Sequence, residues 1–260
     1  MTTRLKLLTF NIAHGRGLSL YQGLQKEKRI RNNLTRIARV IRESGADLVA
    51  LQEVDQDSHW NKQLDLLEII REESGFEHLL YGINTRRSGK RHLAYGNGIL
   101  SRHPVHIWEN NPFGTASLGE KGFLYAEIDI AGHHLPLINL HLDYKSRKKR
   151  IEQVEQIISF ITDKPHPGNN GNTLAPIICG DFNSRSAPLG DAVSHLFRFV
   201  QRHGDYKIYP RQARTFPAHF PSKGIDFIML PYPYQMTESK VIKTKTSDHL
   251  PVLVEFELAD

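Results

Sequence analysis

Short apolar runs alternate with apolar residues at helical spacing along the whole chain. Between residues 26 and 44, Ile30, Leu34, Ile37 and Ile41 recur every three or four positions and Gly45 follows, a pattern that predicts a helix closed by glycine. The same spacing predicts helices at 64–75, 146–160 and 189–200. Runs of branched and aromatic residues predict strands at 5–12, 46–54, 75–83, 95–102, 122–130, 134–142, 174–180, 225–230 and 250–258.

These elements favour one α/β domain with sheets inside and helices outside. The chain shows no repeat of solenoid period and no stretch long enough to serve as a domain linker. A length of 260 residues is compatible with one large core. We therefore expect residues 1–260 to form a single domain.

Composition narrows the class of protein only a little. A formal net charge of +6 and a pI of about 9.3 favour a polyanionic partner such as nucleic acid or acidic head groups, and equally suit a basic protein that binds neither. The single cysteine, Cys179, excludes an internal disulfide. No apolar run approaches the roughly 20 residues that cross a bilayer. We expect a cytoplasmic monomer without a transmembrane segment.

Polar side chains stand where the apolar runs end or begin. In chain order these are Asn11, Glu53, His141, Asp143, Asp181, Asn183, Asp226, Asp248 and His249. A single Asp or Asn at a strand end is usually a turn former or a helix cap. Capping does not explain the set, with "QE", "GDFN" and "SDH" in one chain and in this order.

Gathered carboxylates require a cation among them, because otherwise they repel one another and raise one another's pKa. A hard ion such as Mg²⁺, or Mn²⁺ in its place, suits oxygen ligands and keeps water and substrate phosphate in its shell. The chain offers no His-x-x-x-His pair and only one thiol, so a dedicated zinc site is not indicated. The pattern predicts a divalent-metal site.

The motifs "LLTFNI", "ALQEV", "NLHLD", "CGDFNS", "GIDFIML" and "TSDHLPV" together closely resemble the endonuclease/exonuclease/phosphatase superfamily of metal-dependent phosphoesterases. The resemblance extends from residue 7 to residue 254. It implies a four-layer α/β sandwich, in which two packed mixed β-sheets are flanked by helices. It also implies hydrolysis of a phosphoester with Mg²⁺ or Mn²⁺ as cofactor.

The resemblance assigns roles to the strand-end residues. Glu53 is the principal metal ligand, with Asn11 and Asp248 beside it. Asp181 orients or deprotonates the attacking water, and Asn183 donates hydrogen bonds to the phosphate. The remaining pair acts together: His249 contacts a phosphoryl oxygen, and Asp226 holds the other nitrogen of its imidazole.

Three further positions have roles implied by the resemblance. His141 is a phosphate ligand or a second acid, as in the deoxyribonuclease, sphingomyelinase and phosphatase branches, whereas apurinic endonucleases depart from this pattern. Asn97 and Arg102, in "YGNGILSR", lie beside the site, and Arg102 either contacts phosphate or forms a structural salt bridge. The basic run "KSRKKR" at 145–150 either binds nucleic acid or is a solvated helical face.

The substrate stays open at this point. A nucleic-acid phosphodiester, cleaved by a nuclease, fits the positive charge. The alternative is a phosphatase or a sphingomyelinase-like phosphodiesterase acting on a small or lipid-linked phosphoester. A hypothesis from another class is a catalytically dead binding protein on the same fold, although such a scaffold has no need of the intact site residues.

Overall fold

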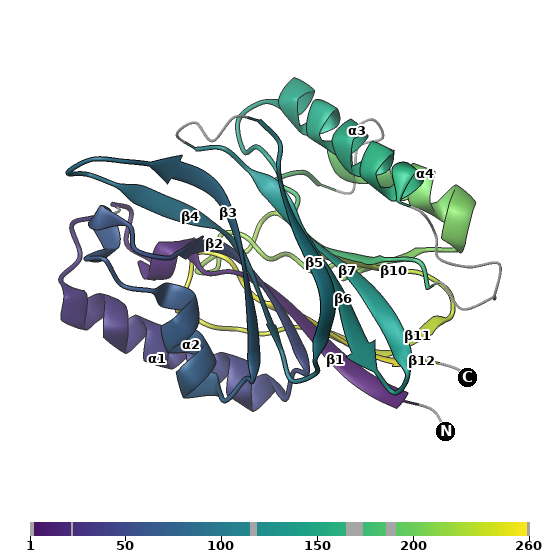
Figure 1. Ribbon diagram of the computed structural model, residues 1–260, viewed down its shortest axis with the longest axis horizontal. Helices are drawn as coiled ribbons and strands as arrows, with labels where there is room; N and C mark the ends of the chain where they lie inside the picture. Colours follow the sequence, from purple (N-terminus) through teal and green to yellow (C-terminus); the bar gives the residue numbers. More distant parts are fainter. Residues whose placement is uncertain (1–2, 22, 115–118, 165–173, 186–190, 259–260) are drawn as a thin grey trace.

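Two six-stranded β-sheets form the centre of the protein (Figure 1). The computed structural model describes residues 3–21, 23–114, 119–164, 174–185 and 191–258. The first sheet contains β1 (Thr3–Asn11), β2 (Leu48–Asp55), β3 (His78–Arg87), β4 (Leu93–Ser101), β11 (Tyr234–Val241) and β12 (Val252–Leu258). The second sheet contains β5 (Val105–Pro112), β6 (Gly122–Ile130), β7 (His133–His141), β8 (Ile177–Asp181), β9 (Lys207–Tyr209) and β10 (Asp226–Leu230).

Four α-helices in the described residues cover the outer faces of the sheets (Figure 1). They are α1 (Glu27–Ser44), α2 (Leu66–Ser74), α3 (Arg147–Asp163) and α4 (Ala192–Gly204). Two short 3₁₀ turns, η1 (Ala13–Gly15) and η2 (His59–Asn61), follow β1 and β2. Figure 1 shows α1 and α2 on one side of the paired sheets and α3 and α4 on the other. None of the helices in this part of the chain is long and apolar enough to cross a membrane.

Three apolar clusters hold the four layers together. On β1, Leu7 packs between the two sheets and Leu8 packs against α1, because neighbouring strand residues face opposite ways. On β7, Leu137 faces the first sheet and Ile138 faces α3 and α4. Strands buried on both faces read as continuous apolar runs. The predicted four-layer α/β sandwich is confirmed.

The sequence pattern missed three of the four strands at the sheet edges and found only β3. All four predicted helices and the inner strands are present, but β5, β9 and β11 were not predicted. The sheet orders are β11-β12-β1-β2-β4-β3 and β5-β6-β7-β8-β10-β9, so β5, β9 and β11 all lie at edges. β5 and β11 are largely exposed and β9 has three residues. Short or exposed edge strands carry little hydrophobic pattern.

The chain directions bring the polar strand ends to one edge of the sandwich. β1 and β2 are parallel, with Asn11 beside Gln52, and β7 and β8 are parallel, with His141 beside Asp181. β10 runs antiparallel to β8, so its first residue, Asp226, pairs with Asp181. Gly180 allows the close approach of β8 to β7, because a Cβ there would lie 1.9 Å from the Leu140 carbonyl oxygen.

A buried amide network fastens the two sheets together near this edge. The Gln52 side chain donates to Oδ1 of Asn139 at 2.7 Å, and the Asn139 amide donates to the Leu51 and Gly98 carbonyls at 2.9 Å. Buried polar groups are stable only when they are hydrogen-bonded. The network therefore fixes β2 and β4 of the first sheet against β7 of the second.

Candidate functional site

A cleft of about 310 Å³ opens at the edge where the polar strand ends meet. Among the predicted site residues, it is lined by Asn11, Glu53, His141, Asp181, Asn183, Asp248 and His249. Asp226 lies behind His249 and is 1% exposed. The structure thus brings eight of the ten predicted side chains together, and what each does chemically is a proposal taken up below.

Glu53 reaches the cleft through an irregularity in β2. The register between β2 and β4 shifts between Gln52 and Val54, which leaves Glu53 without a partner in the ladder. Its φ of 56° lies in the left-handed region, which is unfavourable for a non-glycine residue and concentrates at functional sites. The Nε2 atom of His14 lies 3.6 Å from one carboxylate oxygen of Glu53, and Nζ of Lys121 lies 3.5 Å from the other.

Charged neighbours keep Glu53 ionised despite its burial. Burial raises the pKa of this carboxyl, but His14 and Lys121, assisted by His249, lower it well below its usual range. His14 itself lies 2.6 Å from Asp55. Although burial lowers the pKa of His14, Asp55 and Glu53 outweigh burial and raise it.

Asn11, Glu53 and Asp248 line the cleft with side-chain oxygen atoms of the kind that hard divalent cations bind. Oδ1 of Asn11 accepts a hydrogen bond from the Ala13 amide at 3.0 Å, which leaves its second lone pair free to bind a metal. Asp248 accepts from Arg16 at 2.6 Å through one oxygen. One amide and two carboxylate oxygens, without sulfur, fit Mg²⁺ or Mn²⁺.

Asp181, Asp226 and His249 form a second group, whose ligand atoms all lie within 4.8 Å of one another. Nδ1 of His249 lies 3.0 and 3.1 Å from the two oxygens of Asp226, while its Nε2 lies 3.7 Å from Asp181. Burial lowers the pKa of His249, but Asp226 and Asp181 outweigh it and raise the pKa to about 10. The group is therefore a charged histidine between two carboxylates. Because the imidazolium already offsets their negative charge, a metal ion is needed less here than beside Glu53 and Asp248.

Asp181 lines the cleft with a buried carboxylate. Its Oδ2 accepts from the Asn11 side chain and its Oδ1 from the Asn183 amide, both at 2.9 Å. Burial, opposed by His249, raises the pKa of Asp181 to about 7. Asn183, at φ 48°, uses one side-chain N–H on the Leu142 carbonyl at 3.0 Å, so its second N–H stays available to a substrate.

His141 is neutral and its tautomer is fixed by Lys121. Burial, and after it the Lys121 ammonium, lowers the pKa of His141 well below its usual value. Nζ of Lys121 lies 3.3 Å from Nδ1 of His141. Because an ammonium only donates, Nδ1 accepts and the proton is on Nε2, which lies 3.5 Å from Asp181. This state suits hydrogen-bond donation to a phosphate and disfavours the predicted alternative of a second acid.

Asn97 and Arg102 do not line the cleft, contrary to the expectation that they contact substrate. The Asn97 side chain is fully buried and donates to the Gly122 and Asn139 carbonyls, so it fastens the two sheets. Arg102 follows Ser101, which pairs with Leu48 at the beginning of β2, the opposite end from Glu53. The guanidinium donates to the Ala46 and Gly75 carbonyls and lies over Phe76. Antiparallel pairing of β4 with β2 carries Arg102 away from the site.

Three cations that line the cleft, Arg16, Lys121 and Lys223, were not among the predicted site residues, and neither was His14 beside Glu53. Lys121 was missed entirely, although it immediately precedes β6, whose first residue pairs with His141. A search for polar side chains where apolar runs begin, which identified Asp226, would also have found Lys121. His14 and Arg16 follow Asn11 in "NIAHGRG", and they contact Glu53 and Asp248.

The chain matches a family model and a curated bacterial protein. The model of the Endonuclease/Exonuclease/phosphatase family matches residues 8–249. The curated relative is "Uncharacterized protein YbhP" of Escherichia coli (strain K12), 26% identical over 235 residues, which are 84% of this chain and 86% of that protein.

Solved structures share the fold at low sequence identity. The endonuclease/exonuclease/phosphatase from Beutenbergia cavernae DSM 12333 superposes with a TM-score of 0.74 at 19% identity, over 98% of this chain and 72% of that one. The mannosyl-6-phosphatase Bt3783 of Bacteroides thetaiotaomicron VPI-5482 has a TM-score of 0.72 at 15% identity, over 97% and 99% of the two chains. Because the family model spans nearly the whole sequence, the chain belongs to the endonuclease/exonuclease/phosphatase family.

Proposed function

We propose that the protein is a divalent-metal-dependent phosphoesterase that hydrolyses a phosphodiester by attack of water. The observation that carries this proposal is the buried Asp226–His249–Asp181 group, which shares one cleft with the exposed ends of Glu53 and Asp248. Such a cleft offers a proton acceptor, a cationic donor and oxygen ligands together, as phosphoryl transfer to water requires.

Asn11, Glu53 and Asp248 would hold Mg²⁺, or Mn²⁺ in its place. A bound ion of this kind neutralises charge on the phosphoryl oxygens and on the leaving oxygen. Glu53 suits the task because its lowered pKa keeps it a carboxylate at neutral pH.

Asp181 is our candidate for the group that orients and deprotonates water. Two amide donors, from Asn11 and Asn183, fix both of its oxygens, so the carboxylate cannot rotate freely. Its pKa of about 7 matches a general base that works near neutral pH.

His249, Asn183 and His141 are our candidates for the groups that hold the phosphate. The imidazolium of His249 has one N–H bound to Asp226, and its Nε2–H is free for a phosphoryl oxygen. The second N–H of Asn183 and the Nε2–H of His141 are neutral donors in the same cleft. Fixed donors stabilise the negative charge that grows in the transition state.

The fold does not decide between a diester and a monoester. A mannosyl-6-phosphatase has the same fold, so phosphatase activity on a small phosphoester is the second candidate function. A sphingomyelinase-like phosphodiesterase on a lipid-linked substrate is a variant of the first. Within the diesterases, a nuclease is the form that the net positive charge favours.

Hydrolysis of bis-p-nitrophenyl phosphate and of p-nitrophenyl phosphate tests the proposal. With Mg²⁺ or Mn²⁺ we expect release of nitrophenol, preferentially from the diester, and loss of this activity with EDTA. Asp181→Asn is expected to abolish the activity, whereas Asp129→Asn, at the opposite end of β6, is the matched control. Preference for the monoester would favour the phosphatase, and no metal-dependent turnover of either compound would favour a binding protein.

A further inference from the structure

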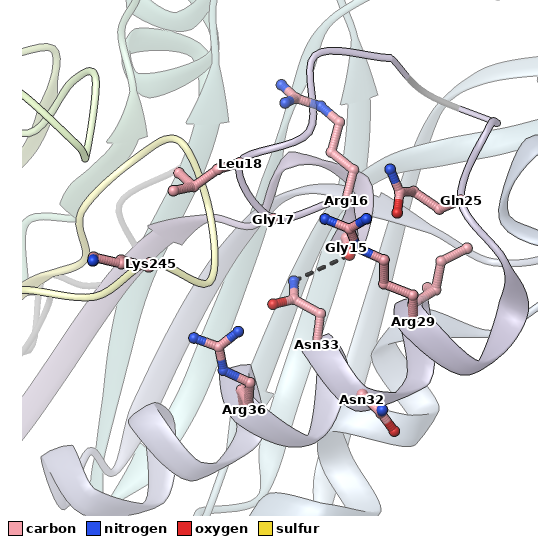
Figure 2. Close-up of a pocket in the computed structure, with 11 residues that line it drawn as sticks. Gly15, Arg16, Gly17, Leu18, Gln25, Arg29, Asn32, Asn33, Arg36 and Lys245 are labelled. Atoms are coloured by element: carbon pink, nitrogen blue, oxygen red, sulfur yellow. Dashed lines mark hydrogen bonds between the residues drawn. The ribbon is translucent and has the colours of Figure 1, made fainter.

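Two basic pockets adjoin the catalytic cleft and each shares a residue with it. The first, of about 330 Å³, carries Arg16, Arg29, Arg36 and Lys245, and Arg16 also lines the cleft (Figure 2). We call it the α1 pocket. The second, of about 220 Å³, carries Arg185, Arg211, Arg214 and Lys223, and Lys223 also lines the cleft. We call it the β10 pocket, since Phe227 of β10 forms part of its wall.

The two pockets belong to different sheets of the sandwich. Figure 2 shows Arg29 and Arg36 on α1, with Arg16 on the loop after β1 and Lys245 on the loop before β12. All of these segments belong to the first sheet and its helix layer. Arg185 follows β8 and Phe227 lies in β10, so the other pocket is built on the second sheet. The cleft lies where the two sheets meet, with one basic pocket on the side of each.

Apart from Arg16, the cations of these pockets have no acidic partner among the described residues. No Asp or Glu lines either pocket in the described residues. Arg29, Arg36 and Lys245 form no ion pair within the part of the chain described, and all three are exposed. Arg16 is different, since it contacts Asp248 at 2.6 Å. Free guanidinium groups in a hollow form bidentate contacts with phosphate oxygens.

The α1 pocket has a rigid frame. Arg29, Asn33 and Arg36 are spaced by four and three residues, which places them on one face of the helix. Asn33 is buried and donates to the Gly15 and Thr246 carbonyls at 3.1 and 2.8 Å. It therefore ties α1 to the loop after Asn11 and to the loop before Asp248, two segments that supply candidate metal ligands.

Exposed aromatic side chains come from the segments that form the pockets. Tyr21 is 68% exposed and lies in the sequence between two residues that line the α1 pocket, Leu18 and Gln25. Phe220 is 76% exposed and lies in the sequence between Arg214 and Ser222 of the β10 pocket. Tyr144, at 62%, lines the cleft itself. Exposed rings beside a basic groove are the platforms on which unpaired bases stack.

We propose that the two pockets bind the phosphates on either side of the scissile phosphodiester of a single-stranded polynucleotide. This inference rests on the proposed phosphodiesterase function. A substrate with one phosphate reaches only the cleft, whereas a strand presents further phosphates at regular intervals along its backbone. Arg29 and Arg36 hold one flank and Arg211 and Arg214 hold the other, with bases against Tyr21, Tyr144 and Phe220.

The test compares an unpaired deoxythymidine oligonucleotide with bis-p-nitrophenyl phosphate in two variants of the full chain. The variants are Arg29→Gln/Arg36→Gln and Arg211→Gln/Arg214→Gln. We expect the ratio of kcat/KM on the oligonucleotide to kcat/KM on the small diester to fall by about 10- to 100-fold in each. The logarithmic dependence of oligonucleotide affinity on salt should flatten by about 1.4 for two lost phosphate contacts.

Arg31→Gln/Arg39→Gln is the matched control, because it removes the same charge from the same helix at residues that do not line the pocket. Its ratio should stay at the wild-type value. An equal loss in this control would show a general charge effect and overturn the proposal.

Three results would overturn the inference while leaving the proposed function intact. One is metal-dependent hydrolysis of the small diester with unchanged oligonucleotide cleavage in both arginine variants. Another is a preference for duplex DNA over the unpaired strand. The third is a preference for a small bisphosphorylated compound, such as an inositol bisphosphate, that the arginine variants reduce. Absence of turnover on the small diester would instead defeat the proposed function.

Discussion

The two halves of the cleft hold their charged groups by different means. In the half built on the first sheet, the side chains of Glu53 and Asp248 are 20% and 23% exposed and lie against His14, Lys121 and Arg16. In the half that contains the second sheet's acids, Asp181 and Asp226 are 1% exposed and His249 is 8% exposed. Asp226 holds Nδ1 of His249 at 3.0 Å, and Asp181 lies 3.7 Å from its Nε2.

This difference suits the two halves of the cleft to different chemical roles. Partly exposed carboxylates with several loosely placed cations can exchange one of them for a metal ion. Buried groups with directed hydrogen bonds are pre-organised and lose much when one partner is removed. The first half is therefore suited to metal binding and the second to proton and phosphate chemistry.

Removal of the imidazole is expected to have the largest effect. His249→Ala should reduce kcat on the order of 10²-fold or more, because a cationic donor to the phosphate is lost. Asp226→Asn should cost less, since the imidazole remains with weaker orientation. The double variant should be hardly slower than His249→Ala, because residues that act as a unit are not additive. Steady-state kinetics decide, and strictly additive losses would show that Asp226 serves only the fold.

Glu53→Gln should weaken metal binding in the first half of the cleft and leave the second half unchanged. Saturating Mg²⁺ at about 100 times its Kd would stabilise the wild-type fold by about 2.7 kcal/mol, and the variant should lose most of this gain. Without metal, its unfolding temperature should stay close to wild type. Thermal unfolding against Mg²⁺ concentration measures both, with Glu72→Gln on the exposed face of α2 as the control. Equal stabilisation by Mg²⁺ in wild type and variant would contradict Glu53 as a ligand.

The pH dependence of stability and of kcat tests the charge of His249 in the second half of the cleft. The pKa of His249 is raised from 6.5 to about 10, so the charged pair with Asp226 stabilises the fold fully below pH 6.5. This contribution is lost as the pH rises through about 10. We expect an alkaline limb in the pH profile of kcat, and a shift of that limb to lower pH in Asp226→Asn. A limb at the same pH in both proteins would argue against His249 as the titrating group.

Lys121→Met should give the smallest change, because Lys121 bridges the halves without belonging to the phosphate-binding group. Its ammonium lowers the pKa of both Glu53 and His141, so the variant should raise both. We expect kcat to fall by about tenfold, equivalent to about 1.4 kcal/mol. NMR titration of His141 in the metal-free protein measures the shift. An unchanged imidazole pKa would exclude the contact between Lys121 and His141 at 3.3 Å.

The basic run at 145–150 shows why charge density along a sequence misleads. Lys149 lies 3.6 Å from Glu120 and 3.9 Å from Asp143, while Lys148 and Arg150 approach Glu152 and Asp191. These contacts favour the solvated helical face over a nucleic-acid site. Arg29, Arg36 and Lys245 of the α1 pocket form no ion pair among the described residues, yet they come from distant parts of the chain.

The sequence by itself determined an α/β domain with sheets inside and helices outside, and its family resemblance implied the four-layer sandwich and eight of the residues that meet at the cleft. Continuous apolar runs specify strands buried on both faces, and parallel neighbours must end at the same edge. Polar residues at strand ends identified Asn11, Glu53, His141 and Asp181 as candidates. An antiparallel strand begins at the edge where its neighbour ends. Asp226 begins such a strand and Asp248 precedes one, so both were identified in the same way.

Only the tertiary structure decided where side chains outside this rule belong. Strand direction carries Arg102 to the far end of β4, and sheet packing buries Asn97. The bulge that turns Glu53 into the cleft leaves no mark in the hydrophobic pattern, because it changes register and not composition. Lys121 contacts Glu53 and His141, which come from other parts of the chain. No acid lines the α1 pocket among the described residues, and this too depends on which distant segments lie close together. Hydrophobic periodicity fixes which face of a strand is buried, whereas electrostatic partners depend on three-dimensional separation, which no local pattern records.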